Sequence, residues 1–154
     1  RQGQEMVDAA LLNQLRNHLV RRATLVTPNL PEACTLGDAQ DPARCARRLL
    51  EIGARWVLVT GTHDSTPQVV NRLYSADGAE RSWTWPRLPG EYHGSGCTLA
   101  SAIAARLALG RSMMEAVSTA QEYTWASLDR AFRTGRGQLT PNRLFQLPEP
   151  QIPS

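Results

Sequence analysis

The sequence has few of the features that mark membrane proteins, disulfide-rich secreted proteins or nucleic-acid-binding proteins. No apolar run approaches the roughly 20 residues that a membrane span requires. Three cysteines, Cys34, Cys45 and Cys97, are an odd number at wide spacing, which argues against a disulfide framework and a zinc site. The net charge of +3 comes from scattered arginines without a basic tract, so we expect no nucleic-acid partner. These absences favour a globular protein of a reducing, cytoplasmic compartment that binds neither nucleic acid nor membrane.

The length and composition are those of a single globular domain. The chain has 154 residues, of which 42% are hydrophobic and 20% charged, enough to build one domain with a core. It contains no internal repeat and no low-complexity linker. We expect one domain over residues 1–145, followed by a proline-rich tail over residues 146–154.

The first part of the chain alternates helical and strand patterns. Apolar residues recur every four positions over residues 5–20, which predicts an amphipathic helix. Short β-branched runs at 23–27 and 55–60 predict buried strands, and helix-start signals follow at Asn29–Pro31 and at Asp41–Pro42. Continuous apolar strands separated by helices are typical of a parallel sheet covered by helices.

The second part of the chain begins with a hairpin signal. Asp77 and Gly78 lie between two β-rich runs, at 69–74 and 81–85, which predicts two antiparallel strands that extend or edge the sheet. A small-residue helix is then expected from the turn near Gly94 to Leu109. A last long helix is expected from Ser112 to about residue 132.

The stretch His93–Leu99, with the sequence His-Gly-Ser-Gly-Cys-Thr-Leu, carries the strongest functional signal. Two glycines let the backbone approach a ligand closely, and the first amides of the following helix point out of its N-terminus without intrahelical partners. Such a turn binds anions, usually phosphate. Cys97 sits in the first turn, where the helix dipole favours a thiolate. The alternatives are an ordinary loop-to-helix turn and a cysteine that packs as a small apolar residue.

Several motifs in this order resemble one known family. Thr27–Ala33 (Thr-Pro-Asn-Leu-Pro-Glu-Ala) follows the first strand, Val59–His63 follows the second, and His93–Leu99 follows the hairpin. This order is similar to the C-terminal portion of hydroxymethylpyrimidine/phosphomethylpyrimidine kinases, which belong to the ribokinase-like superfamily. The resemblance covers roughly residues 7–143. It implies a Rossmann-like three-layer α/β sandwich, with a mainly parallel sheet and helices on both faces.

The resemblance also implies a reaction and a set of site residues. ATP and Mg²⁺ are the implied cofactors, and the γ-phosphoryl group passes to hydroxymethylpyrimidine and then to its monophosphate. Gly94, Ser95 and Gly96 match the anion hole, and Cys97 matches the catalytic-base position. Glu32 is the expected magnesium-binding residue. The remaining expected cofactor-binding residues are Asn29, Thr60, Gly61, His63 and Thr98.

The sequence departs from the family pattern at several points. The strand-end motif is commonly Lys-Gly-Gly-His, whereas here it is Thr60–His63, without the lysine. Asn71 stands where the family often has an aspartate. The family's N-terminal half, which carries most of the pyrimidine pocket, is absent. We therefore expect residues 1–145 to be the C-terminal portion of a kinase domain that is incomplete at its N-terminus and can be inactive alone. Such a piece should be poorly soluble, self-associate or pair with the missing half, and a homodimer is the expected assembly.

Two other functions remain open from the sequence. Pyridoxine or pyridoxal kinases of the same superfamily share the reaction and the anion hole, and the acceptor pocket that would distinguish them is not in this stretch. The other alternative is a non-catalytic remnant that serves as a dimerisation or ligand-sensing module. The intact Gly-Ser-Gly-Cys-Thr turn argues against that remnant.

Overall fold

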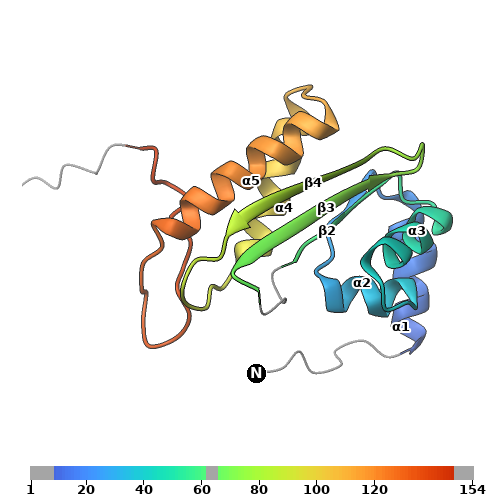
Figure 1. The fold of residues 1–154 in the computed structure, drawn as a ribbon, viewed down its shortest axis with the longest axis horizontal. Helices are drawn as coiled ribbons and strands as arrows, with labels where there is room; N and C mark the ends of the chain where they lie inside the picture. The colour runs from blue at the N-terminus through green and yellow to red at the C-terminus, as the bar shows by residue number, and fades with distance from the viewer. Residues whose placement is uncertain (1–8, 62–65, 148–154) are drawn as a thin grey trace, which may run out of the picture. The chain divides into compact units, whose positions relative to one another are not determined.

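A computed structural model describes residues 9–61 and 66–147 of the chain (Figure 1). The chain divides into two compact units, Arg1–Arg87 and Leu88–Ser154, which are taken in turn. Residues 5–8 of the first expected helix and the expected site residue His63 lie outside the described residues.

The first helical segment is less regular than the sequence predicts. α1 (Ala9–Gln14) gives way to the π-helix η1 (Leu15–Leu19) and the 3₁₀-helix η2 (Val20–Arg22). The prediction of one α-helix up to Val20 is therefore wrong in its second half. Within the π-helix, the Arg16 guanidinium donates hydrogen bonds of 2.8 Å to the carbonyls of Leu36 and Thr35. Tertiary contacts of this kind override local helix propensity.

The four strands form one sheet in the order β1-β2-β3-β4. They are β1 (Leu25–Val26), β2 (Trp56–Val59), β3 (Gln68–Ser75) and β4 (Glu80–Pro86). β1 and β2 are parallel, whereas β2–β3 and β3–β4 are antiparallel. The predicted hairpin is confirmed, but the described sheet is mixed where a mainly parallel one was expected. Eight residues separate β2 from β3, too few for the crossover of a dozen or more residues that parallel pairing needs.

Two helices accompany this sheet, and both begin where the sequence predicts. α2 (Leu30–Gly37) starts after Asn29, and α3 (Pro42–Ile52) starts after Asp41, whose side chain accepts a 2.8 Å hydrogen bond from the Arg44 amide. α3 contacts β2 and β3. The core of this unit includes the buried residues Cys45, Ala46, Leu49, Val57 and Val59.

The second unit is built on two helices that pack against each other, α4 (Ser95–Ala108) and α5 (Met113–Asp129). Ser112 caps α5 by accepting a 3.3 Å hydrogen bond from the Glu115 amide, as its sequence predicts. After α5 the chain returns towards the start of α4 through isolated bridges, which pair Phe132 with Thr140 and Tyr92 with Leu139. The start of α4 is thus held by residues far along the chain.

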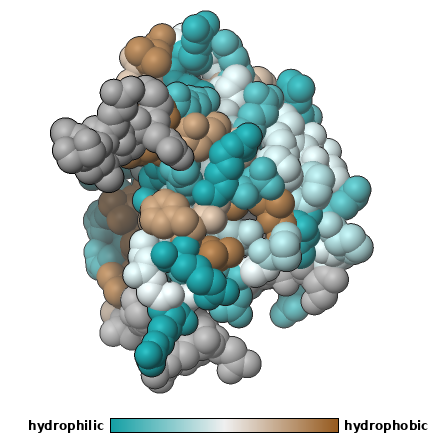
Figure 2. All heavy atoms as spheres, turned by 90° about the vertical axis from the view of Figure 1, so that its left-hand side faces the viewer, coloured by the Kyte–Doolittle hydropathy of each residue, from teal (hydrophilic) through white to brown (hydrophobic). Residues whose placement is uncertain are grey.

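Hydrophobic and hydrophilic residues are interspersed on the face drawn in Figure 2. Six large hydrophobic side chains are exposed in the described residues, namely Leu11, Leu19, Leu109, Phe132, Leu144 and Leu147. Leu11 and Leu19 belong to the apolar stripe expected over residues 5–20, and these two members of it are exposed, whereas Leu15 is partly buried. Within residues 9–61 and 66–147, no helix is both long enough and apolar enough to cross a bilayer.

Candidate functional site

Asn29 and Glu32 form a reciprocal capping box at the start of α2. The Asn29 side chain accepts a 2.9 Å hydrogen bond from the Glu32 amide, and the Glu32 carboxylate accepts a 3.0 Å hydrogen bond from the Asn29 amide. Pro31 occupies the first turn, where its missing N–H costs nothing. The box fixes both polar side chains at the helix N-terminus, where the positive end of the helix dipole favours anions.

Thr60 and Gly61 lie beside this helix start. β1 and β2 run parallel, and the chain continues the pairing beyond them through a parallel bridge between Asn29 and Thr60, with a 3.0 Å hydrogen bond from the Thr60 amide to the Pro28 carbonyl. The carboxyl ends of neighbouring parallel strands are where α/β sheets bind ligands. Asn29, Glu32, Thr60 and Gly61 are therefore brought together at one edge of the sheet.

Two residues that the sequence did not single out for binding hold this edge. The buried Asn71 side chain, on β3, accepts a 3.1 Å hydrogen bond from the Gly61 amide. Arg87 donates to the Gly61 carbonyl at 3.3 Å and to the Thr66 carbonyl at 2.6 Å. A cation thus lies against the strand end that lacks the family's lysine. The antiparallel pairing of β3 with β2 was the signal that could have placed Asn71 there.

The other predicted residues are grouped at the start of α4, in the second unit. Gly94 is the N-cap, with φ 85° and no side-chain cap, and Ser95, Gly96 and Cys97 form the first turn. The helix begins near Gly94, as expected, so Gly96 is helical and of these two glycines only Gly94 has the left-handed conformation. The amides of the first turn have no intrahelical acceptors and point out of the helix N-terminus.

Cys97 and Thr98 have contrasting environments. The Cys97 thiol is exposed, whereas Thr98 is 3% exposed and its hydroxyl donates a 2.8 Å hydrogen bond to the Gly94 carbonyl. An exposed thiol in a first helical turn can reach a bound hydroxyl group. Both residues line one open hollow of the second unit, whose other lining residues are Ser101, Ala102, Ala105, Arg106, Tyr123 and Arg143.

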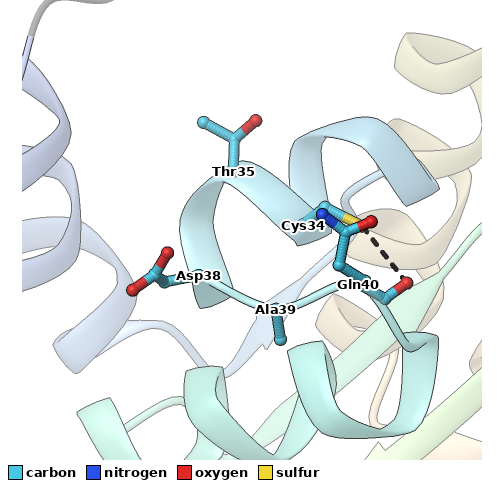
Figure 3. A pocket seen from close by; sticks show the side chains of 5 residues that line it. All are labelled: Cys34, Thr35, Asp38, Ala39 and Gln40. Carbon is cyan, nitrogen blue, oxygen red and sulfur yellow. Dashed lines mark hydrogen bonds between the residues drawn. The ribbon is translucent and has the colours of Figure 1, made fainter.

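A second hollow lies at the end of α2, where Cys34 points towards the Gln40 carbonyl and Asp38 points away (Figure 3). Cys34 is partly buried and Cys45 is fully buried. The pKa of the Cys45 thiol is raised from 9.0 to about 11, mainly by burial and also by the Cys34 thiol 3.7 Å away. This hollow contains none of the predicted site residues.

Glu32 is the predicted magnesium-binding residue, and it offers one carboxylate at the start of α2. Among the residues that the structure describes, no cluster of three or more histidine, cysteine or carboxylate side chains could form a complete metal cage. Mg²⁺ usually keeps several waters and binds through one or two carboxylates together with substrate phosphates. A single carboxylate fixed at a helix start, as Glu32 is, fits this type of site.

Comparison with known proteins gives one family. A family model described as phosphomethylpyrimidine kinase matches residues 1–142. The hydroxymethylpyrimidine/phosphomethylpyrimidine kinase of Streptomyces coelicolor is 38% identical over 142 residues, which are 88% of this chain and 52% of that protein. The thiamine biosynthesis bifunctional protein ThiED of Geobacter sulfurreducens is 35% identical over 93% of this chain and 30% of its own length. The chain therefore spans about half the length of the first relative and less of the second.

Solved structures give the same fold. A Staphylococcus aureus pyridoxal kinase in complex with AMP-PCP has a TM-score of 0.81 and 25% identity, over 87% of this chain and 52% of that one. A Bacillus subtilis pyridoxal kinase, solved as an ADP complex, has a TM-score of 0.83 and 26% identity, over 90% of this chain and 57% of that one. The expected ribokinase-like α/β fold class is thus confirmed.

Proposed function

Because the chain belongs to the phosphomethylpyrimidine kinase family, we propose that it supplies the phosphoryl-handling part of an ATP-dependent kinase. The acceptors are hydroxymethylpyrimidine and its monophosphate, on the route to thiamine. The observation that carries this proposal is the start of α4, where Gly94, Ser95, Gly96 and Cys97 stand within the segment that the family model matches.

The first turn of α4 has the chemistry that phosphoryl transfer requires. Transfer depends on positioning and on stabilisation of the charge that spreads over the equatorial oxygens of the moving group. The amides of Ser95, Gly96 and Cys97 donate hydrogen bonds to that charge from fixed positions. The acceptor hydroxyl oxygen bonds to the γ-phosphorus while the bond to the ADP oxygen breaks, and Cys97 accepts or orients the hydroxyl proton.

The residues at the sheet edge have a complementary role. Glu32 holds Mg²⁺ directly or through water, and the ion supplies charge neutralisation on the phosphate oxygens when bound. Asn29, Thr60 and Gly61 bind the nucleotide phosphates, as does Thr98 on α4. His63, outside the described residues, is a further proposed nucleotide contact.

Pyridoxal kinase is the second candidate function, favoured by the solved pyridoxal kinases that share the fold. The two candidates differ in acceptor only. We would build a chimera in which this chain replaces the segment of the S. coelicolor enzyme with which it aligns. Initial rates would be measured with MgATP and hydroxymethylpyrimidine, its monophosphate or pyridoxal, next to the chain alone.

The proposal expects transfer by the chimera to both pyrimidines and little or none to pyridoxal. Preference for pyridoxal would support the second candidate. Transfer to none of the three by a folded chimera would overturn the kinase proposal and favour the non-catalytic module. The S. coelicolor enzyme without replacement is the positive control.

The chain acts in the cytoplasm and forms a homodimer in this proposal. Its three cysteines are free thiols, as a reducing compartment allows, and exposed apolar side chains such as Leu109 and Leu147 are available for association. Fractionation of cells that express a tagged chain tests the location. Light scattering coupled to gel filtration tests the homodimer, which a monomer at micromolar concentration would contradict.

A further inference from the structure

We propose that Arg143 is a positioning residue for the first turn of α4. It holds the Thr98 hydroxyl, Thr98 holds the Gly94 carbonyl, and the Ser95 amide is thereby aimed out of the helix end. The inference rests on the proposed function, since it concerns the amides that would receive the phosphoryl group. Arg143 lies just beyond the residues matched by the family model.

A continuous hydrogen-bonded relay connects the three residues. Arg143 Nε donates to Thr98 Oγ1 at 3.0 Å, and Thr98 Oγ1 donates to the Gly94 carbonyl at 2.8 Å. The Thr98 amide donates to the same carbonyl at 2.9 Å. A hydroxyl that accepts from a cation becomes a stronger donor, so the charge of Arg143 strengthens the bond to Gly94.

The orientation of one peptide group links the bond at the Gly94 carbonyl to the amide that faces a bound anion. The Gly94 carbonyl and the Ser95 N–H belong to the same planar trans peptide and point in opposite directions. With its carbonyl held towards the helix, the Ser95 N–H points out of the N-terminus, where an anion would bind. Glycine is the most flexible residue type, and Gly94 makes no side-chain cap. The bonds to its carbonyl therefore decide the orientation of the peptide group between Gly94 and Ser95.

Arg143 is itself placed by contacts with α5. Its carbonyl accepts a 2.7 Å hydrogen bond from the Tyr123 hydroxyl, and the neighbouring Asn142 amide donates to the Ser127 carbonyl at 2.9 Å. The guanidinium lies so close to the turn that a Cβ at Gly94 would be 2.8 Å from Nη2. The side chain and the turn therefore form one packed unit.

The charge of Arg143 is not cancelled by a carboxylate in the part of the chain that the structure describes. The ion pairs found there join Arg111 to Glu115 and Arg130 to Asp129. The chain contains 17 arginines and no lysine, so no lysine can supply a cation near the turn. Arg143 combines that charge with a fixed hydrogen-bond geometry, which lysine would not reproduce.

The test uses the S. coelicolor chimera and four variants. Arg143→Gln and Thr98→Val each break the relay, Thr98→Ser keeps the hydroxyl, and Arg106→Gln is the charge control. Arg106 lines the same hollow but donates within its own helix, to the Ala102 carbonyl at 3.2 Å. We expect Arg143→Gln and Thr98→Val to lower kcat about tenfold, as for the loss of one charge-assisted hydrogen bond, with the KM for hydroxymethylpyrimidine unchanged.

The relay predicts two further results of the same kinetic measurements. The Arg143→Gln/Thr98→Val double variant should be no slower than the slower single variant, because both changes interrupt one chain of bonds. Thr98→Ser, which keeps the hydroxyl, should lose less kcat than Thr98→Val, and Arg106→Gln should keep kcat near that of the unaltered chimera. Additive losses in the double variant, or unchanged kcat in both single variants, would overturn the inference.

A readout without catalysis separates this inference from the proposed function. The amide resonance of Ser95 would be followed by NMR in the ¹⁵N-labelled chain during titration with inorganic phosphate. We expect phosphate to move this resonance and to bind about tenfold more weakly in Arg143→Gln. If the chimera transfers no phosphoryl group but the titration behaves in this way, the proposed function fails and the inference stands. Equal phosphate affinity in both forms would overturn the inference.

Discussion

Gly94 and Gly96 stand two residues apart, yet the structure places opposite requirements on them. Gly94 has φ 85°, and a Cβ there would be 2.8 Å from Arg143 Nη2, whereas Gly96 is helical and a Cβ added to it would meet no atom within 4 Å. Gly94→Ala should therefore destabilise the chain by about 1 to 2 kcal/mol. Gly96→Ala should stabilise it by about 0.5 to 1 kcal/mol. Urea denaturation measures both.

The same two variants separate stability from activity. Both should slow phosphoryl transfer in the chimera, because a methyl group at either position stands where the proposed phosphoryl group approaches the backbone. Gly96→Ala would then be more stable and less active. A Gly96→Ala chimera with the rate of the unaltered chimera would mean that the phosphoryl group does not approach this amide.

Cys45 should make the stability of the chain depend on pH in the alkaline range. Its pKa is about 11 in the folded chain against an ordinary value of 9.0. Between these values the unfolded chain has released the thiol proton and the folded chain retains it, so the unfolding free energy falls as pH rises. The contribution is intact below pH 9 and declines up to about pH 11. Denaturation curves at a series of pH values measure this slope.

Cys45→Ala is the control for this slope. Burial also raises the pKa of Tyr74 from 10.0, which destabilises the folded chain in the same direction but at higher pH. In the Cys45→Ala variant, the unfolding free energy should no longer decline from about pH 9, and only the decline at higher pH due to Tyr74 should remain. An unchanged profile in Cys45→Ala would contradict the assignment to this thiol.

Variants at the start of α2 should distinguish a helix-capping role of Asn29 and Glu32 from a metal-binding role of Glu32. Asn29→Ala removes one half of the capping box and should cost about 1 kcal/mol of stability. Glu32→Gln keeps a side chain that can complete the box but lacks the charge that attracts Mg²⁺. We expect the Glu32→Gln chimera to need about tenfold more Mg²⁺ for half-maximal rate, with at most about 1 kcal/mol lost from the dipole interaction.

The two measurements on Glu32→Gln give a clear alternative outcome. If its Mg²⁺ requirement equals that of the unaltered chimera, Glu32 serves only to cap the helix. Thermal denaturation in the absence of Mg²⁺ checks that the helix start is preserved.

Helix starts were predictable where a side chain next to the helix makes the cap. Asn29, Asp41 and Ser112 each accept a bond from a backbone amide three residues later, and such local signals are readable in sequence. α4 has a glycine N-cap without a side-chain bond, so its first residue was less well predicted. The π-helical turn after α1 includes Arg16, whose hydrogen bonds to α2 carbonyls no local pattern contains.

The partners of the site residues were harder to predict than the residues themselves. Asn71, Arg87 and Arg143 meet the predicted residues through hydrogen bonds between positions 10, 26 and 45 apart in the chain. Such pairs depend on strand pairing and on the return of the chain after α5. Motif spacing predicts the residues that we propose to handle a phosphoryl group, and only the fold identifies the residues that hold them in place.

At the scale of the whole molecule, the family and the fold class were predictable because three separated motifs occur in order along the chain. The antiparallel pairing of β2 with β3 was not predicted from the sequence, although the short connection between these two strands indicates it. The sequence likewise left the acceptor open, because the acceptor pocket is expected mostly in the part of the relatives that this chain does not span.

The central claim is that the start of α4, with Cys97, supports phosphoryl transfer. It is tested most directly by measuring kcat with MgATP and hydroxymethylpyrimidine in the chimera and in its Cys97→Ala and Cys34→Ala variants. The account predicts transfer by the chimera, a loss of about 100-fold or more in Cys97→Ala, and little change in Cys34→Ala, whose thiol belongs to the core of the first unit. Full activity in Cys97→Ala would contradict the role of this thiol. A folded chimera that transfers no phosphoryl group would contradict the claim that the start of α4 supports the reaction.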